Sequence, residues 1–243
     1  MNYLLDLHVH TSASLDGLSS LNGQAAAAKT AGLDAIAVTD HNLCTPLPQS
    51  LEGVLLIPGC ELSTLHGHIT GLFLQAPLDL DALRRDGLPS GGAAVEEIHQ
   101  KGGIAVLAHP YQSPGARPED FPFRPDCVEG ANARAALKVK DANERAAALA
   151  RRWGLPAVGG SDAHSRCEVG NARTWVQAEA LTLPALQEAL LAGRCGPVLQ
   201  KNTPHLRKGF SQLAQARRRG GVKNLAVGCA YAAYCGVLDL LGR

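Results

Sequence analysis

The sequence predicts an α/β protein in which parallel strands close into a barrel. Apolar, strand-like runs alternate with helical segments along most of the 243 residues, a pattern typical of repeated βα units. Several of these strands are followed directly by histidine, aspartate or glutamate. The carboxyl ends of the strands meet at one rim of a βα barrel, so these side chains are expected to converge on a single cleft.

The first predicted strand carries two histidines, His8 and His10, at alternate positions. Residues i and i+2 of a strand point to the same side, so the two imidazoles share one face. The other face is predicted to pack against the core and comprises Leu5, Leu7 and Val9. Two adjacent neutral imidazoles favour a metal site, although such a pair alone is equally consistent with chance.

The remaining elements alternate along the chain. A helix over residues 18–32 has an alanine-rich centre and a glycine near its end, which is a common helix stop. Further helices are predicted over residues 92–101, 135–153 and 184–192, and strands over residues 34–39, 54–57, 69–74, 103–108, 126–129, 156–160 and 172–176. The polar residues at strand ends are His41, Glu61, His109, Asp162 and His164. Any one of them could simply face solvent, but their common placement favours a shared site.

Composition restricts the protein class. A chain of 243 residues has ample material for a core. Its seven cysteines are scattered and form no C-x-x-C pair, which disfavours a disulfide framework or a zinc ribbon. The first apolar run is too short for a signal peptide or a membrane span and follows no basic segment. We therefore expect a cytoplasmic protein.

Short motifs occur in a fixed order along the chain: DLHVHT at residues 6–11 with Asp16, TDH at 39–41, PGCE at 58–61 followed by GHI at 67–69, AHP at 108–110 and GSDAH at 160–164. Together they resemble the PHP superfamily, the polymerase and histidinol phosphatase group of metal-dependent phosphoesterases. The resemblance covers roughly residues 1–195. It implies a distorted (β/α)7 TIM-like barrel of the PHP type with up to three divalent metals at the carboxyl-end rim.

The resemblance also implies a ligand set in three groups. His8, His10, Glu61 and Asp162 would surround one metal, Glu61 would bridge to a second with His68 and His109, and Asp16, His41 and His164 would hold a third. His66 is an alternative to His68. Carboxylates offset the repulsion between clustered cations, and imidazoles favour transition metals over magnesium. Two to three ions of zinc, manganese or iron are therefore expected.

The implied reaction is hydrolysis of a phosphate ester by a metal-bridging hydroxide, which needs no protein nucleophile. Glu61, Asp162 and His164 are the expected catalytic residues, and the candidates for binding the substrate phosphate are Arg134, Arg166 and Arg173. The short connection between His68 and His109 favours a compact, open site. The expected substrate is a small phosphomonoester, a nucleotide or the end of a single-stranded nucleic acid. Two alternatives remain: a non-catalytic, structural PHP domain, and a hydrolase of carboxylic or carbamate esters.

Residues 1–199 are predicted to form the phosphoesterase domain and residues 200–243 a basic, helical extension. Residues 201–243 hold eight Lys and Arg against one acid, Asp239, and the run 225–241 is otherwise uncharged. Three interpretations remain open: a membrane helix, a helix that packs on the barrel's side or in an oligomer, and a segment that attracts polyanions. If the segment attracts polyanions, the extension could be removed without loss of small-substrate turnover. The oligomeric state is left open.

Overall fold

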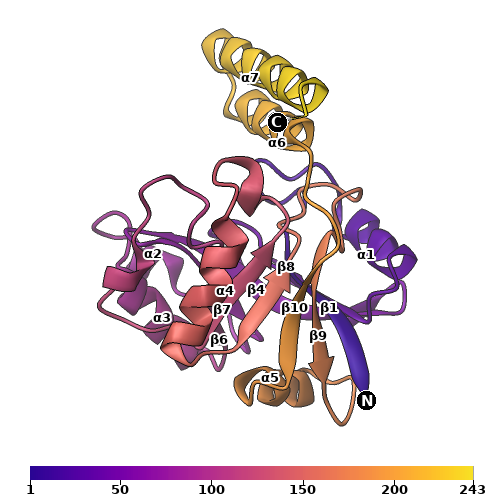
Figure 1. The fold of residues 1–243 in the computed structure, drawn as a ribbon, viewed down its shortest axis with the longest axis vertical. Helices are drawn as coiled ribbons and strands as arrows, with labels where there is room; N and C mark the ends of the chain where they lie inside the picture. The colour runs from indigo at the N-terminus through magenta and orange to yellow at the C-terminus, as the bar shows by residue number, and fades with distance from the viewer. Residues whose placement is uncertain (243) are drawn as a thin grey trace.

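The computed structural model describes residues 1–242, and its centre is one sheet that curls into a nearly closed barrel (Figure 1). The strands are β1 (Asn2–Val9), β2 (Ala35–Val38), β3 (Ser50–Leu51), β4 (Val54–Thr64), β5 (Gly67–Leu72), β6 (Ile104–Leu107), β7 (Cys127–Asn132), β8 (Ala157–Gly160), β9 (Ala172–Gln177) and β10 (Cys195–Leu199). Their order is β10-β9-β1-β2-β4-β5-β6-β7-β8, with β3 beside β4. The barrel fold implied by the motifs is confirmed.

Helices surround this sheet and close one of its ends. They are α1 (Leu21–Thr30), α2 (Leu80–Leu83), α3 (Gly91–Gln100), α4 (Ala142–Trp153), α5 (Leu183–Leu191), α6 (His205–Arg219) and α7 (Val222–Leu240). Ser20 and Ser90 begin α1 and α3, because each hydroxyl accepts a backbone N–H of the first turn. Leu186 and Leu190 of α5 join the main core cluster with Leu5 and Ile57, so α5 covers the end opposite α6 (Figure 1).

The sheet closes where the chain after β8 meets β1. His10 N–H donates to the Ala163 carbonyl at 2.8 Å, and Ala163 N–H donates to the His8 carbonyl at 3.2 Å. Gly160 permits this approach, because a Cβ there would lie 2.4 Å from the Cβ of His8 and 2.7 Å from Oε1 of Glu129. Only glycine fits such a gap.

The first strand departs from strict alternation. A bulge between Asp6 and Val9 shifts its register against β2. Leu5 and Leu7 consequently pack in the main core cluster, whereas Val9 packs in a separate cluster with Ala28 of α1. The expectation that all three apolar residues share one face is wrong for Val9.

Three strands run against the parallel pattern, and the shortest of them is β3, which is antiparallel to β4. β5 is antiparallel to both β4 and β6, because β4 and β5 form a hairpin with no intervening helix. β9 is antiparallel to β1 and to β10. The pattern did not reveal β10, which contains Pro197 and lies at the sheet edge, where a missing N–H is tolerated.

The predicted helix over residues 135–153 is shorter than expected. Residues Ala135–Leu137 form only a 3₁₀ turn, and α4 begins at Ala142. The later start places Asn143 where its side chain accepts the Asn132 N–H at 2.9 Å and donates to the Asn132 carbonyl at 3.1 Å. The helix is thereby tied to the end of β7.

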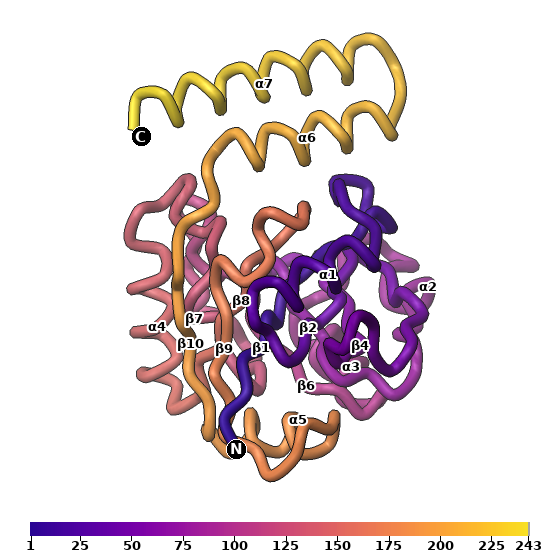
Figure 2. Tube along the Cα trace, turned by 90° about the vertical axis from the view of Figure 1, so that its right-hand side faces the viewer, coloured from indigo at the N-terminus to yellow at the C-terminus, as the bar shows by residue number. Residues whose placement is uncertain are grey.

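The C-terminal helices α6 and α7 pack as an antiparallel pair, with α6 between α7 and the barrel rim (Figure 2). Gly209 and Gly228 allow the close packing, since a Cβ at Gly209 would lie 2.9 Å from Cα of Ala232. The carboxylate of Asp239 accepts the N–H groups of His205 and Leu206, each at 2.8 Å, and so caps α6. Across residues 1–242, no helix combines the length and apolar character required to cross a membrane.

Candidate metal centre

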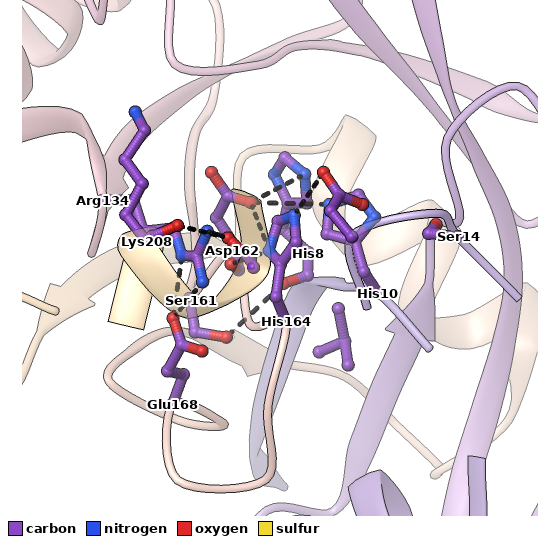
Figure 3. Close-up of polar contacts among 12 residues, drawn as sticks. His8, His10, Ser14, Arg134, Ser161, Asp162, His164, Glu168 and Lys208 are labelled. Carbon is purple, nitrogen blue, oxygen red and sulfur yellow. Dashed lines mark hydrogen bonds and ion pairs between the residues drawn. The ribbon is translucent and has the colours of Figure 1, made fainter. Parts of the chain in front are cut away.

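The structure brings the expected ligand residues together at the carboxyl-end rim, and Figure 3 shows four of them, His8, His10, Asp162 and His164. Most come from the end of a strand, from the residues after it, or from the loop that follows β1, and His68 comes from the start of the antiparallel strand β5. They are His8, His10, Asp16, His41, Glu61, His68, His109, Asp162 and His164. Residues separated by more than half of the chain thus share one site, as the barrel topology predicts.

Glu61 on β4 is fully buried and lies at the centre of the site. Its Oε1 atom lies 2.8 Å from Nδ1 of His68 and 3.0 Å from Nε2 of His109. Its Oε2 atom faces a second group of imidazole nitrogens, those of His41 at 2.9 Å, His10 at 3.3 Å and His8 at 3.4 Å. One carboxylate therefore stands between two groups of imidazoles.

Two aspartates complete the cluster. Oδ1 of Asp162 lies 3.4 Å from Nε2 of His10 and 3.9 Å from Nε2 of His8. Oδ2 of Asp16 lies 3.3 Å from Nε2 of His164 and 3.5 Å from Nε2 of His41. Each contact of Asp162 and Asp16 joins two residues that the resemblance assigns to the same group of ligands.

Backbone strain accompanies two of these residues. His109 has φ of 29° and Asp162 has φ of 55°, both in the left-handed region that non-glycine residues seldom adopt. Such conformations persist where the surroundings fix them, and they concentrate at functional sites. At His109 the fixing contact is the backbone N–H, which donates to Glu129 at 2.8 Å.

The donor set fits divalent cations. Among the described residues, buried side-chain atoms without a hydrogen-bond partner include Nε2 of His8, both ring nitrogens of His10, Oδ1 of Asp16 and Oε2 of Glu61. Burying such atoms unsatisfied costs free energy, which a coordinated cation would offset. Four sets of three side chains place their ligand atoms within 4.8 Å of one another: His10, His41 and His164; His8, His109 and Glu129; His8, His10 and Asp162; and His41, Glu61 and His68.

Burial and neighbouring charges shift the pKa values of His10 and Glu61 in the directions that favour metal binding. Burial, reinforced by the charges of His41 and His164, lowers the pKa of His10 to about 3, so its imidazole is neutral at pH 7 and its lone pair is available. Burial opposes ionisation of Glu61, but the neighbouring imidazoles of His68 and His8 hold its pKa well below the usual range. An ionised carboxylate beside a neutral imidazole is a suitable donor pair for a transition metal.

The pKa of His41 is shifted in the opposite direction from that of His10. Burial disfavours its protonation, but the carboxylates of Glu61 and Asp16 outweigh this effect and raise its pKa to about 11. Cation binding at His41 would therefore release a proton, which makes metal affinity dependent on pH.

Glu129 is a site residue that the sequence reasoning missed. Its Oε1 atom lies 2.9 Å from Nδ1 of His8, and its Oε2 atom accepts the His109 N–H and the Asn132 side-chain amide at 2.8 and 2.9 Å. A carboxylate on the outer nitrogen of a metal-binding histidine orients its ring. The available signal was its position within a predicted strand that precedes Arg134.

The three candidate arginines differ in position. Arg134 lines the cavity, and its guanidinium donates to Glu168 at 2.8 Å and to Ser211 at 3.2 Å. Arg166 is exposed, and the Arg173 guanidinium donates to the Gly170 carbonyl. The structure does not bring either of these two arginines to the cavity.

His66 and His68 lie in different surroundings. His68 contacts Glu61 in the cluster, whereas Nδ1 of His66 accepts the Gly91 N–H at 3.0 Å. The His66 ring packs against Phe121 and Phe123. The geometry supports His68 as the member of the cluster.

A cavity of about 570 Å³ opens above the cluster. Glu61, Asp162 and His164 lie in its wall, and the opposite wall is formed by residues of α6, namely Lys208, Gln212, Gln215 and Arg219. The extension therefore borders the site. This arrangement differs from the expectation of a tail that can be removed without affecting turnover.

Comparison with protein families supports the motif assignment. A PHP domain model matches residues 6–84, and a PHP-associated model matches residues 140–195. An uncharacterised protein of Methanocaldococcus jannaschii is 30% identical over 181 residues, which cover 69% of this chain and 68% of that protein. A protein of Photobacterium profundum named as a probable phosphatase is 24% identical over 213 residues, which cover 70% of this chain and 82% of that protein.

Solved structures share the fold at low sequence identity. PsfC from Pseudomonas syringae matches 98% of this chain and 99% of its own, with a TM-score of 0.62 and 20% identity. A two-domain protein from Bacteroides vulgatus, described as containing a predicted PHP-like metal-dependent phosphoesterase, matches 82% of this chain with a TM-score of 0.59 and 21% identity. The match covers 65% of that protein.

A lesion-specific endonuclease from Pyrococcus furiosus matches 81% of this chain with a TM-score of 0.58 and 17% identity, and the match covers 58% of the endonuclease. The ordered motifs, the matching domain models and the shared barrel agree. The chain belongs to the PHP superfamily and has the fold of its metal-dependent phosphoesterases.

Proposed function

We propose that this protein is a metal-dependent hydrolase of phosphate esters that acts with two to three zinc, manganese or iron ions. The observation that carries the proposal is the position of Glu61, whose two oxygens face separate groups of imidazoles. Buried ligand atoms without hydrogen-bond partners in residues 1–242 support the same conclusion. When bound, the cations would lower the pKa of a water molecule and neutralise charge on the phosphoryl oxygens.

The chain's own residues orient the reacting groups. Nδ1 of His164 donates to the Asp162 carbonyl at 2.9 Å, and this contact directs Nε2 of the same ring at Asp16, whose Oδ2 lies 3.3 Å away. Glu61, Asp162 and His164 all line the cavity and would face a bound ester. Arg134 lines it too, with Glu168 fixing its guanidinium.

The size of the cavity supports a small substrate. A volume of about 570 Å³ lies within the range of small-molecule sites. We therefore place a small phosphomonoester or a mononucleotide ahead of a nucleic-acid end. We also divide the chain into a phosphoesterase domain, residues 1–199, which carries the ligand set, and an extension, residues 200–243, whose helix α6 borders the cavity.

A substrate panel tests this proposal. Phosphomonoesters, phosphodiesters and carboxylic esters would be assayed with the metal-free protein and after loading with manganese or zinc. We expect metal-dependent release of phosphate from monoesters, and loss of that activity in His8→Ala and Asp162→Ala with an unchanged circular dichroism spectrum. Hydrolysis of carboxylic esters alone would favour the alternative hydrolase. Metal binding without any turnover would favour a structural domain.

A further inference from the structure

Helix α6 presents one polar face to the cavity. Lys208, Gln212, Gln215 and Arg219 are spaced by four, three and four residues, so they lie along one side of the helix. All four line the cavity above the metal cluster. Figure 2 shows α6 running across this rim, beneath α7.

Contacts on two sides hold α6 in place. Near its beginning, Thr203 N–H donates to the Ala133 carbonyl at 2.8 Å, and Ser211 accepts from Arg134. Near its end, the Arg218 guanidinium donates to the Ser14 carbonyl in the loop after β1. The helix therefore spans the opening between two loops that carry site residues.

Lys208 stands out on this face because its ammonium forms no ion pair within residues 1–242. In the part of the chain that the structure describes, no carboxylate oxygen lies within 4.0 Å of its ammonium, and no hydrogen bond reaches it. The nearby Glu168 is already paired with Arg134 at 2.6 Å. Figure 3 shows Lys208 beside Arg134, with its ammonium on the side away from Glu168.

The surroundings of Lys208 disfavour an isolated cation. Burial, together with the neighbouring charges of Lys138 and Arg134, lowers the pKa of its ammonium to about 8, although the carboxylate of Asp162 acts in the opposite direction. A partly buried cation among other cations is stabilised by an anion that enters the cavity. Phosphoryl oxygens are suitable partners, because charge-assisted hydrogen bonds to them are short and strong.

We infer that Lys208 binds the phosphoryl group of a small anionic substrate, so that the C-terminal extension completes the substrate site. This inference rests on the proposed function and specifies its substrate. An ester bound here lies between the metal cluster and α6, which restricts it to molecules that fit beneath the helix. The interior of a long nucleic acid would not fit.

Binding of inorganic phosphate tests the inference directly. Isothermal titration calorimetry on the manganese-loaded protein would compare wild type with Lys208→Gln and Lys208→Arg. Lys201→Gln is the matched control, because Lys201 is exposed and lies ahead of α6, outside the cavity. We expect Lys208→Gln to weaken phosphate binding about tenfold or more. Lys208→Arg should restore most of the affinity, and Lys201→Gln should bind as wild type.

The thermal midpoint is a second readout. Because the ammonium forms no ion pair or hydrogen bond with the described part of the chain, Lys208→Gln should not lower the melting temperature, and manganese content should stay at the wild-type level. A melting temperature several degrees lower would show that Lys208 has a structural role and would overturn the inference.

Failure of this inference can be told apart from failure of the proposed function. Equal phosphate affinity in wild type and Lys208→Gln, or no phosphate binding by wild type, overturns the inference even if esters are hydrolysed. Phosphate binding that depends on Lys208 without any ester hydrolysis supports the inference and contradicts the proposed function.

Discussion

Nδ1 of His8 lies 2.9 Å from Oε1 of Glu129, while Nε2 of the same ring faces Glu61 at 3.4 Å. A buried carboxylate thus orients the imidazole from one side, and its other nitrogen is directed into the cluster. The same Glu129 accepts the backbone N–H of the strained His109. One side chain therefore positions two members of the cluster.

Glu129→Gln should weaken metal binding. The amide keeps the size of the side chain but loses the charge that fixes the His8 ring, and such changes cost about 10- to 100-fold in metal affinity or activity. Titration of the metal-free protein with zinc against a competing chelator measures this. Glu179→Gln, at an exposed position after β9, is the control and should bind zinc as wild type. Unchanged zinc affinity in Glu129→Gln would contradict the positioning role.

Gly160→Ala should disrupt the junction between β8 and β1. The added methyl group would lie 2.4 Å from Cβ of His8 and 2.7 Å from Oε1 of Glu129, so both would have to move. We expect a loss of about 1–3 kcal/mol in the free energy of unfolding, measured with denaturant, and weaker zinc binding. Gly236→Ala in α7 is the control, because its nearest contact would be an ordinary 3.6 Å. Equal effects at both positions would contradict this explanation.

Glu168→Gln should destabilise the protein strongly. Glu168 and Arg134 form an ion pair in which both side chains are nearly inaccessible, with Nη2 and Oε2 2.6 Å apart. Removing one partner leaves a buried charge uncompensated, at a cost of about 3–5 kcal/mol.

The exposed pair of Glu188 and Arg194 provides the comparison. Glu188→Gln should change the free energy of unfolding by less than about 1 kcal/mol. Similar losses for the two variants in urea titrations would show that burial of the Arg134 pair carries no special cost.

Asp40 should contribute stability that depends on pH. Burial opposes its ionisation, but hydrogen bonds from Thr45, Thr11 and Ser14 outweigh burial and hold its pKa below the ordinary value of 3.8. Its contribution is therefore present above about pH 4 and disappears as pH falls through the lowered pKa of the folded state. Asp40→Asn should melt below wild type at pH 7, and the difference should shrink toward pH 3. A constant difference between pH 7 and pH 3 would contradict the ionised state of Asp40.

The sequence was most informative where an apolar strand pattern is followed directly by a side chain that can bind a metal. Buried strands that end in His, Asp or Glu predicted the rim of the barrel, because such residues are rare beside apolar runs unless they have a role. It was less informative for the direction of β5 and for β10. The strand pattern over residues 69–74 predicted β5 but not that it runs antiparallel to its neighbours, and an edge strand with Pro197 looks locally like a connection.

The position of the extension depended on long-range contacts that no local pattern reports. Asp239 caps α6 from a distance of 34 residues in sequence, and Arg218 reaches Ser14 at the other end of the chain. The basic composition of residues 201–243 was evident, but its location above the metal cluster follows only from these contacts. For the same reason, Lys208 was not among the sequence-based candidates for phosphate binding.

The metal content of the purified protein tests the central claim most directly. Elemental analysis of wild type, after incubation with manganese or zinc and removal of free metal, should give two to three transition-metal ions per chain, because the family resemblance implies three groups of ligands, two of which share Glu61. Glu61→Ala, which removes the carboxylate shared by two of these groups, should retain at most one. A wild-type content well below one ion per chain after this treatment would contradict the account.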